Sequence, residues 1–139
     1  MAGMQEIWYN FEHVAIAFLL TATVGWVSEQ EDHTAGIRTF PIVGMASCGY
    51  LLLLGTQPDV AAQSRLLQGL ITGIGFIGGG AILREGATVR GTATAASVWN
   101  AGVIGAAVAM NRYGIAITLA LLNVFTLRAL LPLKKWLDR

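Results

Sequence analysis

The segment Gly69–Trp99 decides the fold, and its first part reads GLITGIGFIGGGAIL (residues 69–83). It belongs to an uncharged, largely apolar run from Leu66 to Leu83. This run contains six glycines: Gly69, Gly73, Gly75, Gly78, Gly79 and Gly80. In water it would be a poor helix, because each interior glycine costs roughly 1 kcal/mol relative to alanine. In a bilayer the backbone must satisfy its own hydrogen bonds, so the run is predicted to form a transmembrane helix.

The six glycines fall on two sides of this predicted helix. One side carries Gly69, Gly73 and Gly80, and the other carries Gly75, Gly78 and Gly79. Small residues let neighbouring backbones approach closely in a membrane. A glycine-rich helix with two smooth sides is therefore predicted to lie at the centre of a helix bundle.

The composition also indicates a membrane protein. The chain has 139 residues, of which 55% are hydrophobic and only 12% are charged, whereas a soluble domain carries about 25% charged residues. The net charge of +1 gives no indication of a nucleic-acid partner. The single cysteine, Cys48, cannot form a disulfide within the chain. One domain is expected at this length.

Five apolar runs predict an all-α bundle of about five transmembrane spans in a single domain, residues 1–139. The runs cover residues 11–27, 39–54, 66–83, 92–110 and 113–131. They are near the short end for crossing a hydrocarbon core of about 30 Å, and the second is the least well defined. Pro132 is predicted to end the last helix before a short basic tail, residues 132–139.

The basic residues predict the orientation, because cytoplasmic loops are rich in lysine and arginine. Five spans place the first loop, the third loop and the C-terminus on one side of the membrane. That side holds seven basic residues: Arg38, Arg84, Arg90, Arg128, Lys134, Lys135 and Arg139. The other side holds only Arg65 and Arg112. We therefore expect the N-terminus outside and the C-terminus in the cytoplasm.

The fourth run carries small residues four positions apart, at Ser97, Ala101, Gly105 and Ala109. This stripe is predicted to pack closely against the glycine-rich helix. One neighbour needs only one of the two glycine faces. The other face is then expected to pack against the same face of a second copy, giving a two-fold homodimer, with another membrane protein as the alternative partner.

The sequence favours neither an enzyme nor a cofactor site. Residues 73–78, GIGFIG, match the G-x-G-x-x-G dinucleotide pattern, but no strand precedes them and no acidic residue follows about 20 positions on. Asn100 and Asn123 are predicted to make hydrogen bonds between helices. His13 is predicted to be an interfacial polar residue, with proton sensing as the weaker alternative.

Charged residues gather in the first and third loops, on the predicted cytoplasmic side. Buried charges need partners, so Glu29 or Glu31 is predicted to pair with Arg84 or Arg90. The alternative is a carboxylate cup of Glu29, Glu31 and Asp32 for magnesium, which prefers oxygen ligands. No magnesium or other cofactor is required by the remaining sequence.

Three blocks of the sequence resemble the MgtC/SapB family of bacterial membrane proteins. They are Glu29 with AGIRT (residues 35–39), GIGFIGGG (73–80), and REG, VRG, TAA and a tryptophan within residues 84–99. Gln30 stands where that family usually has arginine, and Ala93 where it usually has threonine or asparagine. The chain is similar to the membrane domain of the longer members, and we expect it to lack their soluble C-terminal domain.

The resemblance implies an inner-membrane protein linked to growth under magnesium limitation and, in pathogens, to virulence. It also implies a regulator that acts by helix–helix contact with other membrane proteins, ATP synthase among them. A transporter or channel for magnesium or another small solute is the alternative, because Gly78–Gly80 could form a broken helix. The functional site is expected in a cytoplasmic-face cluster of Glu29, Arg38, Thr39, Arg84, Arg90 and Thr94.

Overall fold

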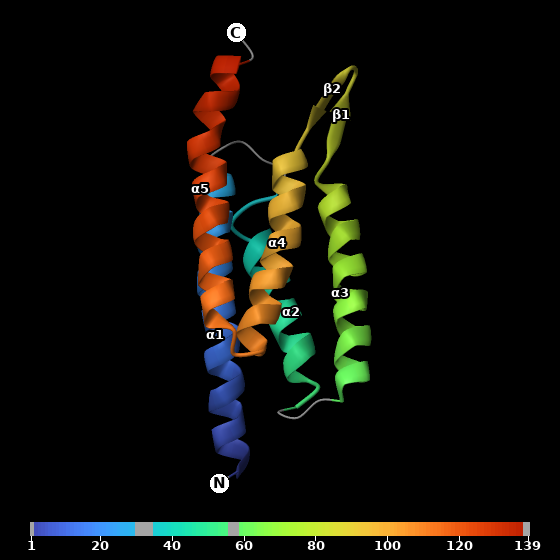
Figure 1. The fold of residues 1–139 in the computed structure, drawn as a ribbon, viewed down its shortest axis with the longest axis vertical. Coiled ribbons are helices and arrows are strands. Elements are labelled where there is room, and N and C mark those ends of the chain that lie inside the picture. Colours follow the sequence, from blue (N-terminus) through green and yellow to red (C-terminus); the bar gives the residue numbers. More distant parts are fainter. Residues whose placement is uncertain (1, 30–34, 56–58, 138–139) are drawn as a thin grey trace.

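The computed structural model describes residues 2–29, 35–55 and 59–137, and these residues form a helix bundle (Figure 1). The helices are α1 (Ala2–Glu29), α2 (Thr39–Leu52), α3 (Val60–Gly80), α4 (Thr92–Ala109) and α5 (Tyr113–Leu137). A two-stranded antiparallel hairpin, β1 (Leu83–Glu85) and β2 (Thr88–Arg90), joins α3 to α4. The predicted all-α helical bundle is confirmed.

The centre of the bundle is α4, where we had predicted the glycine-rich helix. In Figure 1, α4 lies between α5 and α3, and it contacts all four other helices. Its residues Val98, Ile104 and Val108 are fully buried. In α3, by contrast, only Ile74 and Gly78 are buried. The alanines and glycines of α4 leave room for a neighbour on every side, whereas α3 packs along one side only.

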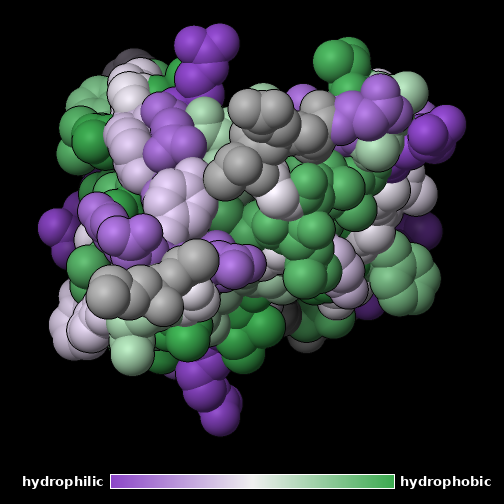
Figure 2. All heavy atoms as spheres, turned by 90° about the horizontal axis from the view of Figure 1, so that it is seen from below, coloured by the Kyte–Doolittle hydropathy of each residue, from purple (hydrophilic) through white to green (hydrophobic). Residues whose placement is uncertain are grey.

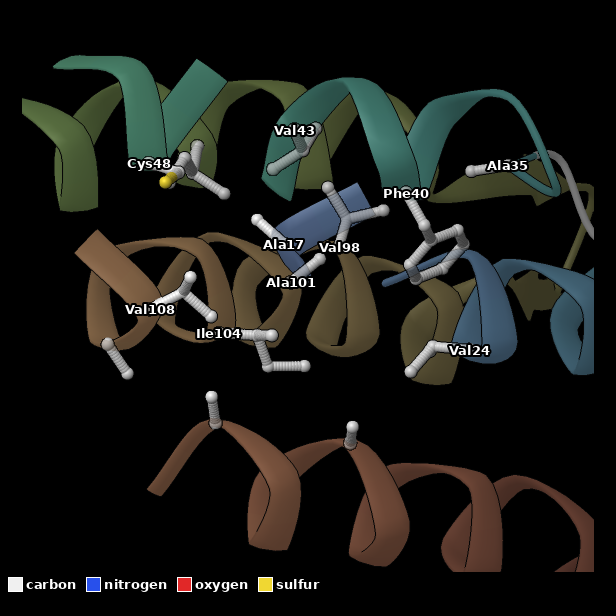
Figure 3. Packing of buried hydrophobic residues seen from close by; sticks show 14 of the residues in the cluster. Ala17, Val24, Ala35, Phe40, Val43, Cys48, Val98, Ala101, Ile104 and Val108 are labelled. Carbon is white, nitrogen blue, oxygen red and sulfur yellow. The ribbon is translucent and has the colours of Figure 1, made fainter. Parts of the chain in front are cut away.

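The hydrophobic core lies mainly between α1, α2 and α4 (Figure 3). Phe40 of α2 is its largest fully buried side chain, and it lies near Val24 of α1. Val43 of α2 and Val98 of α4 fill the neighbouring space. The second apolar run, which was the least well defined in the sequence, therefore contributes a large part of the core.

The closest approach between helices in the core is at Gly44 and Gly105. A Cβ atom added to Gly105 would collide with the carbonyl oxygen of Gly44. A Cβ atom added to Gly44 would lie 2.6 Å from the Oγ1 atom of Thr21 on α1. The small-residue stripe of α4 thus makes its closest backbone contact with α2, whereas we had predicted α3.

The third predicted loop forms the hairpin, in which Arg84 pairs with Val89 and Leu83 with Arg90. Gly86 begins its turn with a φ of 63°. Gly91 follows the hairpin with a φ of 82°, and a Cβ atom there would collide with the carbonyl oxygen of Ala81. A glycine is therefore needed where the end of α3 meets the start of α4.

Two expectations about helix breaks differ from the structure. Pro132 lies inside α5, which continues to Leu137, so the predicted break at this proline is wrong. Proline removes only one backbone N–H group, so a helix can continue through it with the loss of a single backbone hydrogen bond. The triplet Gly78–Gly80 is also helical, and α3 shows no unwound segment.

Among the described residues, three helices have the length and apolar composition needed to cross a membrane: Gly3–Glu29, Thr92–Ala109 and Tyr113–Leu130. The helix Thr39–Leu52 is apolar but shorter. Large apolar side chains face outward, and Phe76 of α3 is 86% exposed. Figure 2 shows hydrophobic residues between scattered polar ones at the end that holds the N-terminus. The number of spans, five, stays a prediction.

Candidate functional site

The residues of the predicted cytoplasmic-face cluster lie toward one end of the bundle, the upper end in Figure 1. The end of α1, the start of α2, the hairpin and the start of α4 all lie in this part. We call it the hairpin end, defined by Glu29, Arg38 and the hairpin residues 83–90. Thr94 lies in the first turn of α4, which directly follows the hairpin.

Glu29 holds the segment that leads into α2. Its Oε2 atom accepts a hydrogen bond of 3.1 Å from the backbone N–H of Ile37. Its carboxylate also occupies the space that a side chain on Gly36 would need. The neighbouring Ser28 is fully buried and donates to the carbonyl oxygen of Ala35 at 3.0 Å. These contacts give the glutamate a local structural role, which the sequence pattern did not indicate.

The arginines of the hairpin do not come together with Glu29. Arg84 donates from Nε to the carbonyl oxygen of Gly86 at 3.2 Å, within the hairpin itself. Arg84 pairs with Val89, the neighbour of Arg90, and successive strand residues point to opposite faces. Arg84 and Arg90 therefore extend from opposite faces of the ribbon. Within the described part of the chain, neither forms the predicted ion pair with Glu29.

The remaining members of the predicted cluster differ in exposure. Arg38 is exposed at the N-cap position of α2, and its side chain makes no capping hydrogen bond. Thr39, the next residue, is half-buried. Thr94 is fully buried, and its Oγ1 atom has no hydrogen-bond partner. The structure thus brings the cluster to one end of the bundle without joining its side chains.

The predicted interhelical hydrogen bonds of the two asparagines are confirmed. Ser97 of α4 donates to Oδ1 of Asn123 on α5 at 2.8 Å. Asn100 donates to the carbonyl oxygen of Leu119 at 3.4 Å. The Nδ2 atom of Asn123 is buried without a partner, which costs free energy for a polar group.

Two of the three candidate magnesium ligands, Glu31 and Asp32, lie outside the described residues. The third, Glu29, uses its carboxylate on the backbone of Ile37. Among the residues that the structure describes, no group of three or more His, Cys, Asp or Glu side chains could hold a metal ion.

A polar cluster at the opposite end of the bundle was not predicted. His13 of α1 is 2% exposed, and its Nδ1 atom lies 2.7 Å from the carbonyl oxygen of Tyr9. Its Nε2 atom lies 2.9 Å from Oδ1 of Asn111 and 3.0 Å from the hydroxyl of Tyr113. Asn111 also donates to the hydroxyl of Tyr9 at 3.1 Å.

This cluster ties α1 to the turn between α4 and α5. Asn111 adopts a left-handed φ of 57°, which asparagine tolerates better than most residues. The only sequence feature that pointed to this cluster was an asparagine between two apolar runs, because such an asparagine indicates a tight turn. Nothing in the sequence pairs it with a histidine 98 residues away.

The glycines of α3 divide into one that is packed and five that are not. A Cβ atom on Gly78 would lie 3.0 Å from the carbonyl oxygen of Ala95 on α4. At the other positions such an atom would meet nothing within 4 Å: Gly69, Gly73, Gly75, Gly79 and Gly80. By helical periodicity Gly75 and Gly79 face away from α2, and Gly69 and Gly73 lie on the side toward it.

Comparison with known proteins places the chain in a family. The MgtC family matches residues 14–136. Protein MgtC of Salmonella typhimurium is 35% identical over 98 residues, which are 70% of this chain and 42% of that protein. Protein MgtC of Brucella abortus is 30% identical over 103 residues, or 71% of this chain and 43% of that protein.

An uncharacterized protein of Synechocystis is 27% identical over 125 residues, which are 90% of this chain and 53% of that protein. The chain thus spans about half the length of the curated relatives it matches. No solved structure matches it. The match over residues 14–136 and the apolar helices together show that the chain is a membrane protein of the MgtC family.

Proposed function

We propose that this chain is an inner-membrane regulator that contacts other membrane proteins through α3, in adaptation to magnesium limitation or intracellular stress. The open glycine face of α3, formed by Gly75 and Gly79, carries the proposal. Among the described residues, nothing outside the adjoining backbone of α3 lies within 4 Å of a Cβ position on either glycine. Helices associate in membranes through such small-x-x-x-small surfaces, because they let two backbones approach closely.

The occupant of this face is a transmembrane helix of another protein, with ATP synthase among the candidates that the family resemblance implies. A second copy of the chain is the other candidate, and mass measurement in nanodiscs distinguishes the two. Phe76 is 86% exposed next to Gly75, and its ring would reach into a groove of the partner helix.

Growth in low magnesium tests the proposal. We expect Gly79→Leu to abolish complementation of a deletion strain, because the added side chain keeps the partner backbone away, while expression and insertion stay normal. Gly114→Leu is the matched control, since Gly114 on α5 also has nothing within 4 Å of its Cβ position. Normal growth of the Gly79→Leu strain would contradict docking at this face.

We also propose that the hairpin end faces the cytoplasm and contributes Arg84 and Arg90 to the functional site. Both guanidinium groups are exposed. Arg84→Ala should abolish low-magnesium growth, and Arg112→Ala, at the opposite end of the bundle, should not. Wild-type growth of both the Arg84→Ala and Arg90→Ala strains would place the site elsewhere.

Cysteine labelling tests the orientation in a Cys48→Ala background. A cysteine at position 87, in the hairpin turn, should react only with reagent in the cytoplasm. One at position 59, before α3, should react from outside. The reverse pattern would overturn the proposed orientation. Purified protein in liposomes should in addition give no magnesium flux above empty liposomes, and a reproducible flux would favour the transporter alternative.

A further inference from the structure

A groove of about 370 Å³ runs between α2 and α3, within the range of about 300–1,000 Å³ that small-molecule sites occupy. Ala46 and Tyr50 of α2 form one wall, and Gly69, Gly73 and Ile77 of α3 form the other. The groove exists because the two glycines contribute no side chains to it. A Cβ atom on either would meet nothing within 4 Å.

The groove is polar at one end and, apart from Ser47 of α2, apolar along the rest of its length. Because α2 and α3 run in opposite directions, Tyr50 and Arg65 lie at the same end, where α2 finishes and α3 begins. Val43 and Ile77 lie toward the other end. Arg65 is the single charged residue of the lining, its side chain is exposed, and it has no hydrogen bond or ion pair among the described residues.

This arrangement matches the chemistry of a phospholipid. Tyrosine and arginine are common at the level of the lipid headgroups, and a guanidinium group can bind a phosphate through two parallel hydrogen bonds. From Arg65 the apolar groove follows the helices toward the middle of the membrane, the course that an acyl chain takes. We propose that this groove binds one phospholipid, with its phosphate on Arg65 and an acyl chain over Gly69 and Gly73.

A second copy of the chain fits the groove less well. In a two-fold dimer the same surface faces itself, so two concave grooves would enclose an empty space. The two copies of Arg65 would also lie at the same end of the interface, where like charges repel. A flexible acyl chain fills such a concave surface without either penalty. This inference needs only the membrane setting of the chain, and it holds whether or not α3 docks a partner.

Native mass spectrometry of delipidated protein in mild detergent, with added dioleoyl-phosphatidylglycerol, tests the site. The parent should retain one lipid. Gly73→Leu fills the groove and should weaken retention by at least about tenfold, equivalent to about 1.4 kcal/mol. Arg65→Gln removes the phosphate partner from an exposed position where folding is unaffected, and retention should fall by several-fold.

Two controls separate the groove from its surroundings. Gly79→Leu adds the same side chain to the other face of α3, and Arg112→Gln removes an exposed arginine from the same end of the bundle. Both should retain the lipid like the parent. Unchanged retention in both Gly73→Leu and Arg65→Gln would overturn the proposal. So would a parent that is dimeric without lipid and becomes monomeric in Gly73→Leu, because a second copy would then occupy the groove.

Discussion

Two sets of glycines in this molecule have opposite surroundings. Gly44 and Gly105 lie where α2, α4 and α1 meet, and neither has space for a further atom. Gly75 and Gly79 of α3 have open space where their side chains would be. The first pair brings backbones together inside the chain, and the second leaves a helix surface uncovered. The same residue type thus supports the fold in one place and leaves the proposed docking surface in another.

The largest effect should come from filling the buried contact. Gly105→Leu would place a side chain against the carbonyl group of Gly44, which belongs to helix backbone and cannot rotate away. Overpacking typically costs about 1–3 kcal/mol, and more where backbone must move. We expect little folded protein, measured as fluorescence-detected size exclusion of a fusion in mild detergent. Gly79→Leu should elute like the parent. Equal losses of folded protein in Gly105→Leu and Gly79→Leu would show that the two glycines do not differ in their surroundings.

A smaller effect, with a rescue, is expected at Gly44. Gly44→Ala puts a methyl group 2.6 Å from both Oγ1 and Cγ2 of Thr21, and we expect the free energy of unfolding to fall by about 1–3 kcal/mol. Thr21→Ala removes both atoms. The double variant should therefore be about as stable as Thr21→Ala alone in a denaturant titration. Additive losses would show that Thr21 is not what limits the space at Gly44.

A loss of about 1 kcal/mol is expected for Gly36→Ala. Its methyl group would displace the Glu29 carboxylate, which ends a flexible side chain, and break its bond to the N–H of Ile37. Glu29→Ala should then destabilise the protein by a similar amount, and the double variant should lose little more. The same titration measures all three variants. A larger loss in the double variant would mean that residue 36 has a second, independent contact.

The smallest effect should be at the open face. Gly79→Ala adds a methyl group that meets nothing and improves helix propensity, so we expect unchanged stability or a gain of up to about 1 kcal/mol. Thermal unfolding in detergent measures this. A clear loss of stability would show that the α3 face is covered in the isolated protein, which would point to a stable dimer.

The sequence predicted the class of fold and the approximate helices, because long apolar runs with few charges have one stable arrangement in a membrane. It did not predict which helix is central. The spacing of small residues at Gly69–Gly73 or Ser97–Gly105 shows that a helix can pack closely against another. Whether it does so depends on the surfaces of both helices in the pair. Gly44 gave no such pattern, because a single glycine within the shortest apolar helix makes the contact.

The hairpin and the hydrogen bond of Glu29 both depend on residues that are close in sequence, but neither was predicted. Gly86 and Ala87 form a two-residue turn between Leu-Arg-Glu and Thr-Val-Arg, and a glycine at the first of two turn positions is a known hairpin signal. The hydrogen bond that the N–H of Ile37 donates to Glu29 spans only eight residues, but its geometry depends on Gly36. The functional cluster was predicted from the motif blocks and the side of the membrane that they share, and these indicate which residues lie in one region but not which side chains touch.

The cluster around His13 has a consequence for how the chain is assembled in the membrane. Its partners Asn111 and Tyr113 are synthesised 98 and 100 residues later, which at about 5–20 residues per second is a delay of about 5–20 s. During that interval, of the partners found in the described part of the chain, only Tyr9 of its own helix is available to the imidazole on α1. The hydrogen bonds of His13 to Asn111 and Tyr113 form only after the turn between α4 and α5 has been synthesised. The position of α1 is therefore fixed by a part of the bundle that is made late.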